Sequence, residues 1–197
     1  MIILPMTLFL GFCTPEKRKA ASDDTAAEDH TESLQSVHLT KAWSSEPVLT
    51  TCESTLYDKQ RNIIYVANIN GKPTEKNGQG FISKLQPDGT IAQLQWIMVL
   101  HAPKGMAIYN NVLYVTDIDV LVEIDIERGV VNNTYRVEKA SFLNDVAVDE
   151  QGTVYFTDSD TGRIHRLQNG VVSVWKEDPG FERPNGLYHR GDELLLA

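Results

Sequence analysis

The sequence predicts an all-β protein, a β-propeller of four-stranded blades, from three observations. A short apolar run recurs along the chain, Gly, Asn and Asp mark the turns, and no amphipathic helix is evident after residue 46. The runs align on Tyr65, Tyr114, Tyr155 and Leu195, which lie 49, 41 and 40 positions apart. A strand-rich repeat near 40 residues is typical of propeller blades.

The third repeat contains all four expected strands of a blade. They are predicted at 145–149, 153–158, 163–167 and 171–175. Asn169-Gly170 supplies the positive φ angles of a tight hairpin between the last two, and Asp88-Gly89 and Arg128-Gly129 stand at the same point in the earlier repeats. A polar insertion at 71–80 explains the longer first interval.

Residues 47–197 therefore form an incomplete propeller of about three and a half blades. A propeller protects its strand edges by closing its ring, and Ala197 falls within an expected strand. We expect the chain to be part of a protein of roughly 300 residues, or the product of a truncated gene.

Residues 1–13 are typical of an export signal. The apolar run Met1–Phe12 is too short to span a bilayer but fits a signal-peptide core. Leu10-Gly11-Phe12-Cys13 resembles a bacterial lipoprotein signal, which predicts lipidation of Cys13; the alternative is a cleaved leader. We expect an exported protein, either secreted or a periplasmic or cell-envelope lipoprotein that meets the membrane only through its lipid.

The segment 14–46 is rich in Ala, Ser, Thr, Asp and Glu and shows no hydrophobic period. It is predicted to be a disordered acidic tether. If Cys13 is lipidated or removed, the only other cysteine, Cys52, is unpaired, so stability must come from the core.

The net charge of −9 argues against nucleic acid as a partner, because phosphates require clustered Lys and Arg. Acidity suits a cation, or simply solubility. No catalytic triad, phosphate loop or zinc-type cluster is found, and no two of the five histidines have ligand spacing. His165, between basic neighbours in a strand, is expected to face solvent.

Polar residues stand at the starts of the inner strands, which line the channel of a propeller. They are Glu53, Lys104, Asn144-Asp145 and Asn185. One carboxylate among amide oxygens suits a hard divalent cation such as Ca²⁺. The alternative is structural, since Asn and Asp commonly cap turns.

Three motifs carry a family resemblance that covers about residues 47–197. They are Cys52-Glu53-Ser54-Thr55-Leu56-Tyr57-Asp58, Leu143-Asn144-Asp145-Val146-Ala147-Val148-Asp149 and Arg183-Pro184-Asn185-Gly186-Leu187. In this order they resemble the senescence-marker-protein/gluconolactonase (regucalcin-like) family. The resemblance implies a six-bladed propeller with one Ca²⁺ or Zn²⁺ ion in the channel.

By the same resemblance, Glu53 and Asn185 are expected metal ligands, and Asn144 is expected to contact substrate or metal-bound water. The expected catalytic aspartate would lie beyond Ala197. Phe142 departs from the family, which often has an Arg there to hold a sugar acid. Two functions stay open: a metal-dependent hydrolase of lactones or related esters, and a non-catalytic propeller that binds a small molecule or protein at the cell envelope. An inactive truncated fragment is the third possibility.

Overall fold

A computed structural model of the protein describes residues 38–197, so the expected leader with Cys13 and most of the expected tether lie outside the described residues. Residues 38–197 form 14 strands and no helix, in three four-stranded antiparallel sheets and one two-stranded sheet. The first sheet contains β1 (Cys52–Asp58), β2 (Ile63–Asn68), β3 (Gly80–Leu85) and β4 (Ile91–Leu100). The second contains β5 (Pro103–Tyr109), β6 (Val112–Asp117), β7 (Val120–Asp125) and β8 (Val130–Arg136). The third contains β9 (Leu143–Val148), β10 (Val154–Asp158), β11 (Arg163–Gln168) and β12 (Val171–Glu177), and the last β13 (Leu187–Arg190) and β14 (Glu193–Leu196).

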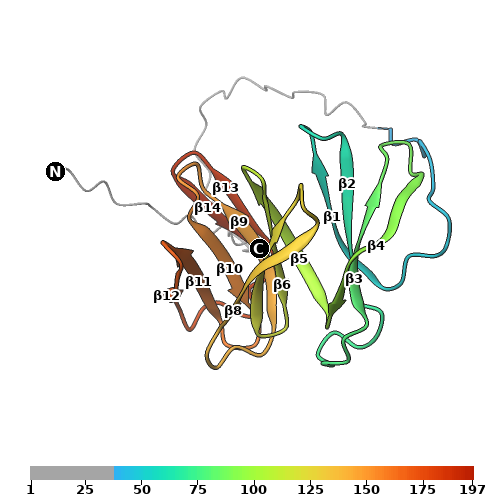
Figure 1. Ribbon diagram of the computed structural model, residues 1–197. Helices are drawn as coiled ribbons and strands as arrows, with labels where there is room; N and C mark the ends of the chain where they lie inside the picture. Colours follow the sequence, from blue (N-terminus) through green and yellow to red (C-terminus); the bar gives the residue numbers. More distant parts are fainter. Residues whose placement is uncertain (1–37) are drawn as a thin grey trace, which may run out of the picture.

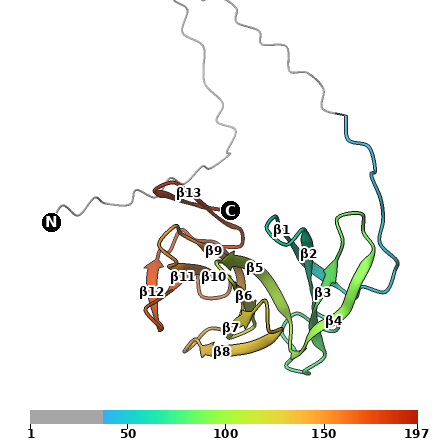
Figure 2. The same ribbon diagram turned by 45° about the horizontal axis from the view of Figure 1, so that its top comes forward.

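This arrangement confirms the propeller fold, with about three and a half blades. The strands of each sheet follow chain order, and the three full sheets radiate from one side in Figures 1 and 2. The inner strands β1, β5 and β9 lie toward that side, which we call the channel side, and β4, β8 and β12 lie outside. Within the described chain no helix is long and apolar enough to span a bilayer.

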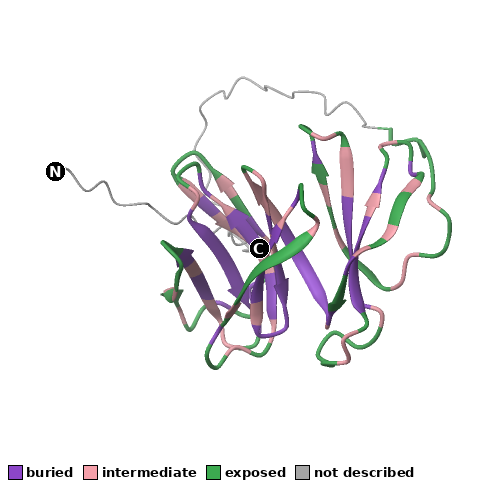
Figure 3. Cartoon of the chain, viewed as in Figure 1, coloured by how far each residue is buried: buried purple, intermediate pink, exposed green. Residues whose placement is uncertain are grey.

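The core lies between blades rather than inside one sheet. One buried cluster joins the first and second blades, a second joins the second and third, and another joins the third blade to β13 and β14. Successive residues alternate between these interfaces, so that Val122 packs toward the first blade and Leu121 toward the third. The central strands are therefore buried on both faces, while β8 and β12 are largely exposed (Figure 3).

His165 shows the consequence of this two-sided burial, and the expectation that it faces solvent is wrong. Its side chain in β11 is only 2% exposed and stacks on Phe156 with ring centroids 5.5 Å apart. The Nε2 atom has no hydrogen-bond partner among the described residues. Burial is the main cause that lowers the pKa of His165, against the smaller opposing effect of Asp158.

This lowered pKa predicts that the protein loses stability in acid. The unfolded chain takes up a proton near the ordinary histidine pKa of about 6.5, whereas folded His165 resists protonation. Its neutral form is fully compatible with folding above that pH, and stability falls as the pH drops below it. In thermal melts between pH 8 and pH 5, His165→Phe should reduce this fall. Equal pH dependence in the wild type and His165→Phe would contradict the assignment.

Candidate functional site

Four residues occupy the same position in successive blades at the channel side. Glu53, Lys104 and Asn144 are each the second residue of an inner strand, and Asn185 stands two residues before β13. We call these four positions the channel-end ring. The ring holds one carboxylate, one ammonium group and two amides, which makes it the candidate site.

Hydroxyl groups fix the backbone of the ring from one blade to the next. Thr157 Oγ1 donates a hydrogen bond to the carbonyl oxygen of Asn185 at 2.8 Å, and Thr116 Oγ1 donates one to the carbonyl oxygen of Asn144. In both pairs the asparagine lies 28 residues after the threonine. In the first blade Ser54 Oγ donates to the carbonyl oxygen of Lys104. Each ring residue after the first is therefore positioned by the blade before it.

Asp117 and Asp158, which follow these threonines in the chain, hold the segments that lead into the inner strands of their own blades. Asp117 accepts hydrogen bonds from the amides of His101 and Ala102 at 2.8 and 2.6 Å, and Asp158 accepts one from the Phe142 amide at 3.1 Å. These side chains are buried, so their carboxylates serve the fold and not a ligand. Thr116 of the second blade and Asp158 of the third thus hold the backbone at and before the Asn144 ring position.

Glu53 keeps its carboxylate open. It is exposed and has no hydrogen bond or ion pair with any described residue. Although the residue as a whole is exposed, its carboxylate is partly desolvated, and this burial is the largest cause that raises its pKa. Lys104 acts in the opposite direction, and Asp145 raises the pKa further.

Asp145 follows the ring residue Asn144 in β9, and both of its carboxylate oxygens accept hydrogen bonds from backbone amides. Its Oδ2 accepts a hydrogen bond from the Leu187 amide and its Oδ1 one from the Val146 amide, both at 2.8 Å. Burial raises the pKa of Asp145 and the two amide bonds lower it. This carboxylate links the third blade to β13 and places a second negative charge near Glu53.

The two amides of the ring differ in freedom. Asn144 is buried, and its Nδ2 donates to Ser159 Oγ at 3.1 Å, while Ser159 in turn donates to the Pro184 carbonyl at 2.7 Å. Asn185 is exposed, and its side chain has no hydrogen bond with a described residue. Asn144 is therefore fixed in orientation, whereas Asn185 can turn its amide toward a ligand.

Lys104 is the unexpected member of the ring. Its side chain is buried, Nζ donates to the Ala102 carbonyl at 3.0 Å, and the ammonium group lies 4.6 Å from the ring centroid of Phe142. Burial lowers its pKa most, while Asp117, Glu53 and Asp160 raise it. The sequence placed Lys104 at the start of an inner strand, but gave no sign of its burial.

The free oxygens of Glu53 and Asn185 fit part of a cation site. Carboxylate and amide oxygens are the donors that Ca²⁺ prefers, and neither side chain is committed to a protein partner within residues 38–197. The described residues contain no group of three or more His, Cys, Asp or Glu side chains placed to hold a metal ion. Besides Lys104, the ring thus offers oxygen donors from one carboxylate and two amides.

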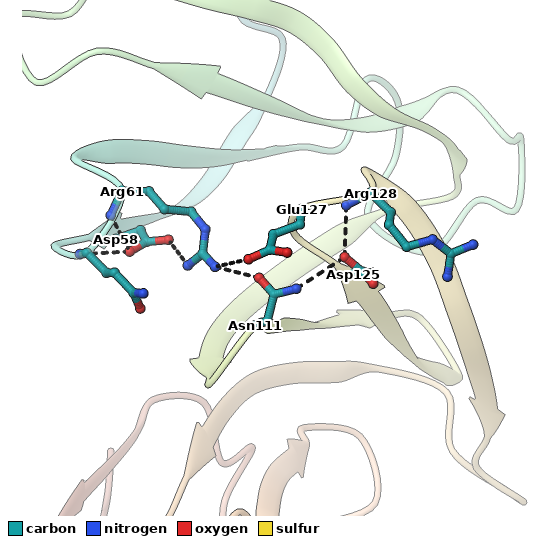
Figure 4. Close-up of polar contacts among 7 residues, drawn as sticks. Asp58, Arg61, Asn111, Asp125, Glu127 and Arg128 are labelled. Atoms are coloured by element: carbon teal, nitrogen blue, oxygen red, sulfur yellow. Dashed lines mark hydrogen bonds and ion pairs between the residues drawn. The ribbon is translucent and has the colours of Figure 1, made fainter.

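A second polar cluster lies at the other end of the strands, and it is structural (Figure 4). Arg61 pairs with Asp58 at 3.0 Å and donates to Asn111 Oδ1 at 2.5 Å, and Asn111 donates to Asp125 at 3.3 Å. Glu127 lies 3.9 Å from the same guanidinium. These bonds join turns of the first and second blades and leave the ring as the more open polar site.

No protein-family model matches the chain, and no curated protein sequence does either. Solved structures with a similar fold include virginiamycin B lyase from Staphylococcus aureus, with a TM-score of 0.53 and 14% identity over 69% of this chain and 44% of that one. A chain of the nidogen/laminin complex has a TM-score of 0.56 and 14% sequence identity, and the match covers 77% of this chain and 54% of that one. The extracellular domain described as part of a hybrid two-component system from B. thetaiotaomicron has a TM-score of 0.55 and 13% sequence identity. That match covers 74% of this chain and 21% of the other.

The chain thus spans about half or less of the length of these proteins. At such low identity the likeness supports the propeller fold alone. The resemblance to the gluconolactonase family, carried by the three sequence motifs, stays a prediction.

Proposed function

We propose that the chain belongs to a ligand-binding propeller, and that its channel-end ring holds a divalent cation through Glu53 and Asn185. The observation that carries this proposal is that both side chains, at equivalent positions of two blades, have no hydrogen-bond or ion-pair partner among residues 38–197. A cation at this point would interact favourably with the carboxylates of Glu53 and Asp145, while Lys104 acts on Glu53 in the opposite direction to Asp145. A small molecule would bind over the cation, in contact with Asn144.

Calcium binding at the ring should raise the melting temperature, because the ion binds only the folded chain. At a concentration about 100 times the Kd the expected gain is about 5–10 °C. Glu53→Gln should abolish the gain, since it removes the one free carboxylate of the ring. Glu150→Gln, an exposed change in the turn between β9 and β10, should keep it. Identical melting of the wild type in chelator, in Ca²⁺ and in Zn²⁺ would contradict the proposal.

Hydrolysis of lactones or related esters is a second candidate for the same ring. The observation in its favour is that Ser159 fixes the Asn144 amide within the ring, and fixed orientation is what substrate positioning requires. A bound cation would supply polarisation of the substrate carbonyl, and Asn144 would orient the substrate. Turnover of a lactone or ester that is lost in Glu53→Gln would support this candidate. If the protein binds the cation but turns over none of a panel of lactones, the hydrolase candidate is excluded and the non-catalytic binding function remains.

Export and lipidation of Cys13 complete the proposal and rest on the sequence alone. Mass spectrometry of the N-terminal peptide from membrane fractions would detect a lipid on Cys13. An unmodified peptide that still contains residues 1–12 would contradict both expectations.

A further inference from the structure

Lys104 is the only basic residue among the four ring positions. Its counterparts in the other blades are a carboxylate and two amides. The Lys104 side chain is 1% exposed, so water screens its charge poorly. A buried lysine amine therefore stands in the ring position where the next two blades have an amide.

The surroundings of Lys104 hold this amine in place. Nζ donates to the Ala102 carbonyl at 3.0 Å, Phe142 lies against the ammonium group at 4.6 Å, and Ser54 binds the Lys104 carbonyl. These contacts come from the lysine's own blade and from both neighbouring blades. The ammonium group itself contacts Ala102 of its own blade and Phe142 of the third, while Ser54 of the first blade holds the Lys104 backbone.

Three carboxylates act electrostatically on Lys104, and they differ in how far they are already engaged. Asp117 accepts two backbone amide bonds, and Asp160 pairs with Arg183 at 2.9 Å. Of the three, only Glu53 has no partner within the described chain. The field of Lys104 therefore falls on the same carboxylate that we assign to cation binding.

We propose that Lys104 limits the affinity of the ring for divalent cations, by holding a buried amine at the ring position of the inner strand next to the one that carries Glu53. The proposal rests on the proposed function and deepens it. A divalent cation at Glu53 is repelled by the protonated amine twice as strongly as a monovalent one. The ring accordingly binds Ca²⁺ more weakly than its oxygen donors would allow, and a neutral residue at position 104 removes that restraint.

The test is a Ca²⁺ titration, read as the melting temperature of the 197-residue chain. Lys104→Met keeps the length of the side chain and its packing against Phe142 but removes the charge. We expect it to lower the Ca²⁺ concentration that gives half of the melting shift by about tenfold or more. Lys104→Gln serves as a second neutral variant should the methionine variant fail to fold. Lys176→Met removes one charge from exposed β12 and is the matched control, expected to leave the midpoint unchanged.

The outcomes separate this inference from the function on which it rests. A lower midpoint Ca²⁺ concentration in the neutral Lys104 variants, with an unchanged midpoint in Lys176→Met, supports the inference. A Ca²⁺ response found only in the neutral Lys104 variants supports it as well. A Ca²⁺ response that is the same in the wild type and both Lys104 variants overturns it and leaves the cation site standing. Absence of any response in all proteins overturns both.

Discussion

Gly105→Ala is expected to lower the free energy of unfolding by about 3 kcal/mol, because the added methyl group overpacks a contact between blades. A Cβ atom at Gly105 would lie 2.5 Å from both Cα and Oδ1 of Asp145 and 2.7 Å from the Asn144 carbonyl oxygen. Two of these three atoms are backbone and cannot move aside alone. Urea unfolding followed by circular dichroism measures the loss.

Gly186 offers a matched control, because it follows the ring position in the last blade as Gly105 does in the second. There the nearest heavy atom to an added Cβ is Ala197 Cβ at 3.5 Å, an ordinary contact. Gly186→Ala should change stability by no more than about 0.5 kcal/mol. Equal losses at the two glycines would show that close contact between the blades is not the cause.

Thr157→Val should lower the free energy of unfolding by about 2–3 kcal/mol, since it leaves two backbone groups without a partner. The buried Thr157 hydroxyl donates to the Asn185 carbonyl at 2.8 Å and accepts from the Asp145 amide at 2.9 Å. Valine fills the same space but supplies neither bond. Because the Asn185 backbone is then held less firmly, the Ca²⁺ response should also weaken.

Thr134→Val provides the comparison for this change. Thr134 lies on the exposed strand β8, where the same substitution should alter stability by less than about 0.5 kcal/mol. If Thr157→Val were as stable as Thr134→Val, the hydroxyl bonds would not hold the blades together as described.

The repeat made the fold predictable from the sequence. The aligned runs around Tyr65, Tyr114 and Tyr155 do form the second strands, and Asn169-Gly170 does form the predicted hairpin. These features are local, since they depend on residues that are neighbours in one strand or turn. For that reason they could be inferred without knowing how the blades pack.

Packing between blades is what the sequence could not supply, as His165 shows. Its strand appeared to have a polar face, but one face of β11 packs toward the second blade and the other toward β13 and β14. The burial of Lys104 was missed for the same reason, because Phe142 and Ser54 reach it from neighbouring blades. Alternation of polar and apolar residues identifies a strand but does not say what covers each face.

The candidate site was partly predictable. The spacing of the repeat placed Glu53, Asn144 and Asn185 at equivalent points, and the structure gives them equivalent places at the starts of the inner strands. The roles of Thr116 and Thr157 were missed, although a signal existed: each stands 28 residues before the asparagine whose carbonyl it binds. Such partners lie in the next blade and are recognised only when the repeats are compared in register.

The most direct test of the cation site is a crystal structure of the protein grown with Ca²⁺. The proposal predicts a bound ion at the channel-end ring, at about 2.3–2.6 Å from oxygens of Glu53 and Asn185. An ion bound elsewhere, or a ring that holds only water at a Ca²⁺ concentration that raises the melting temperature, would contradict it.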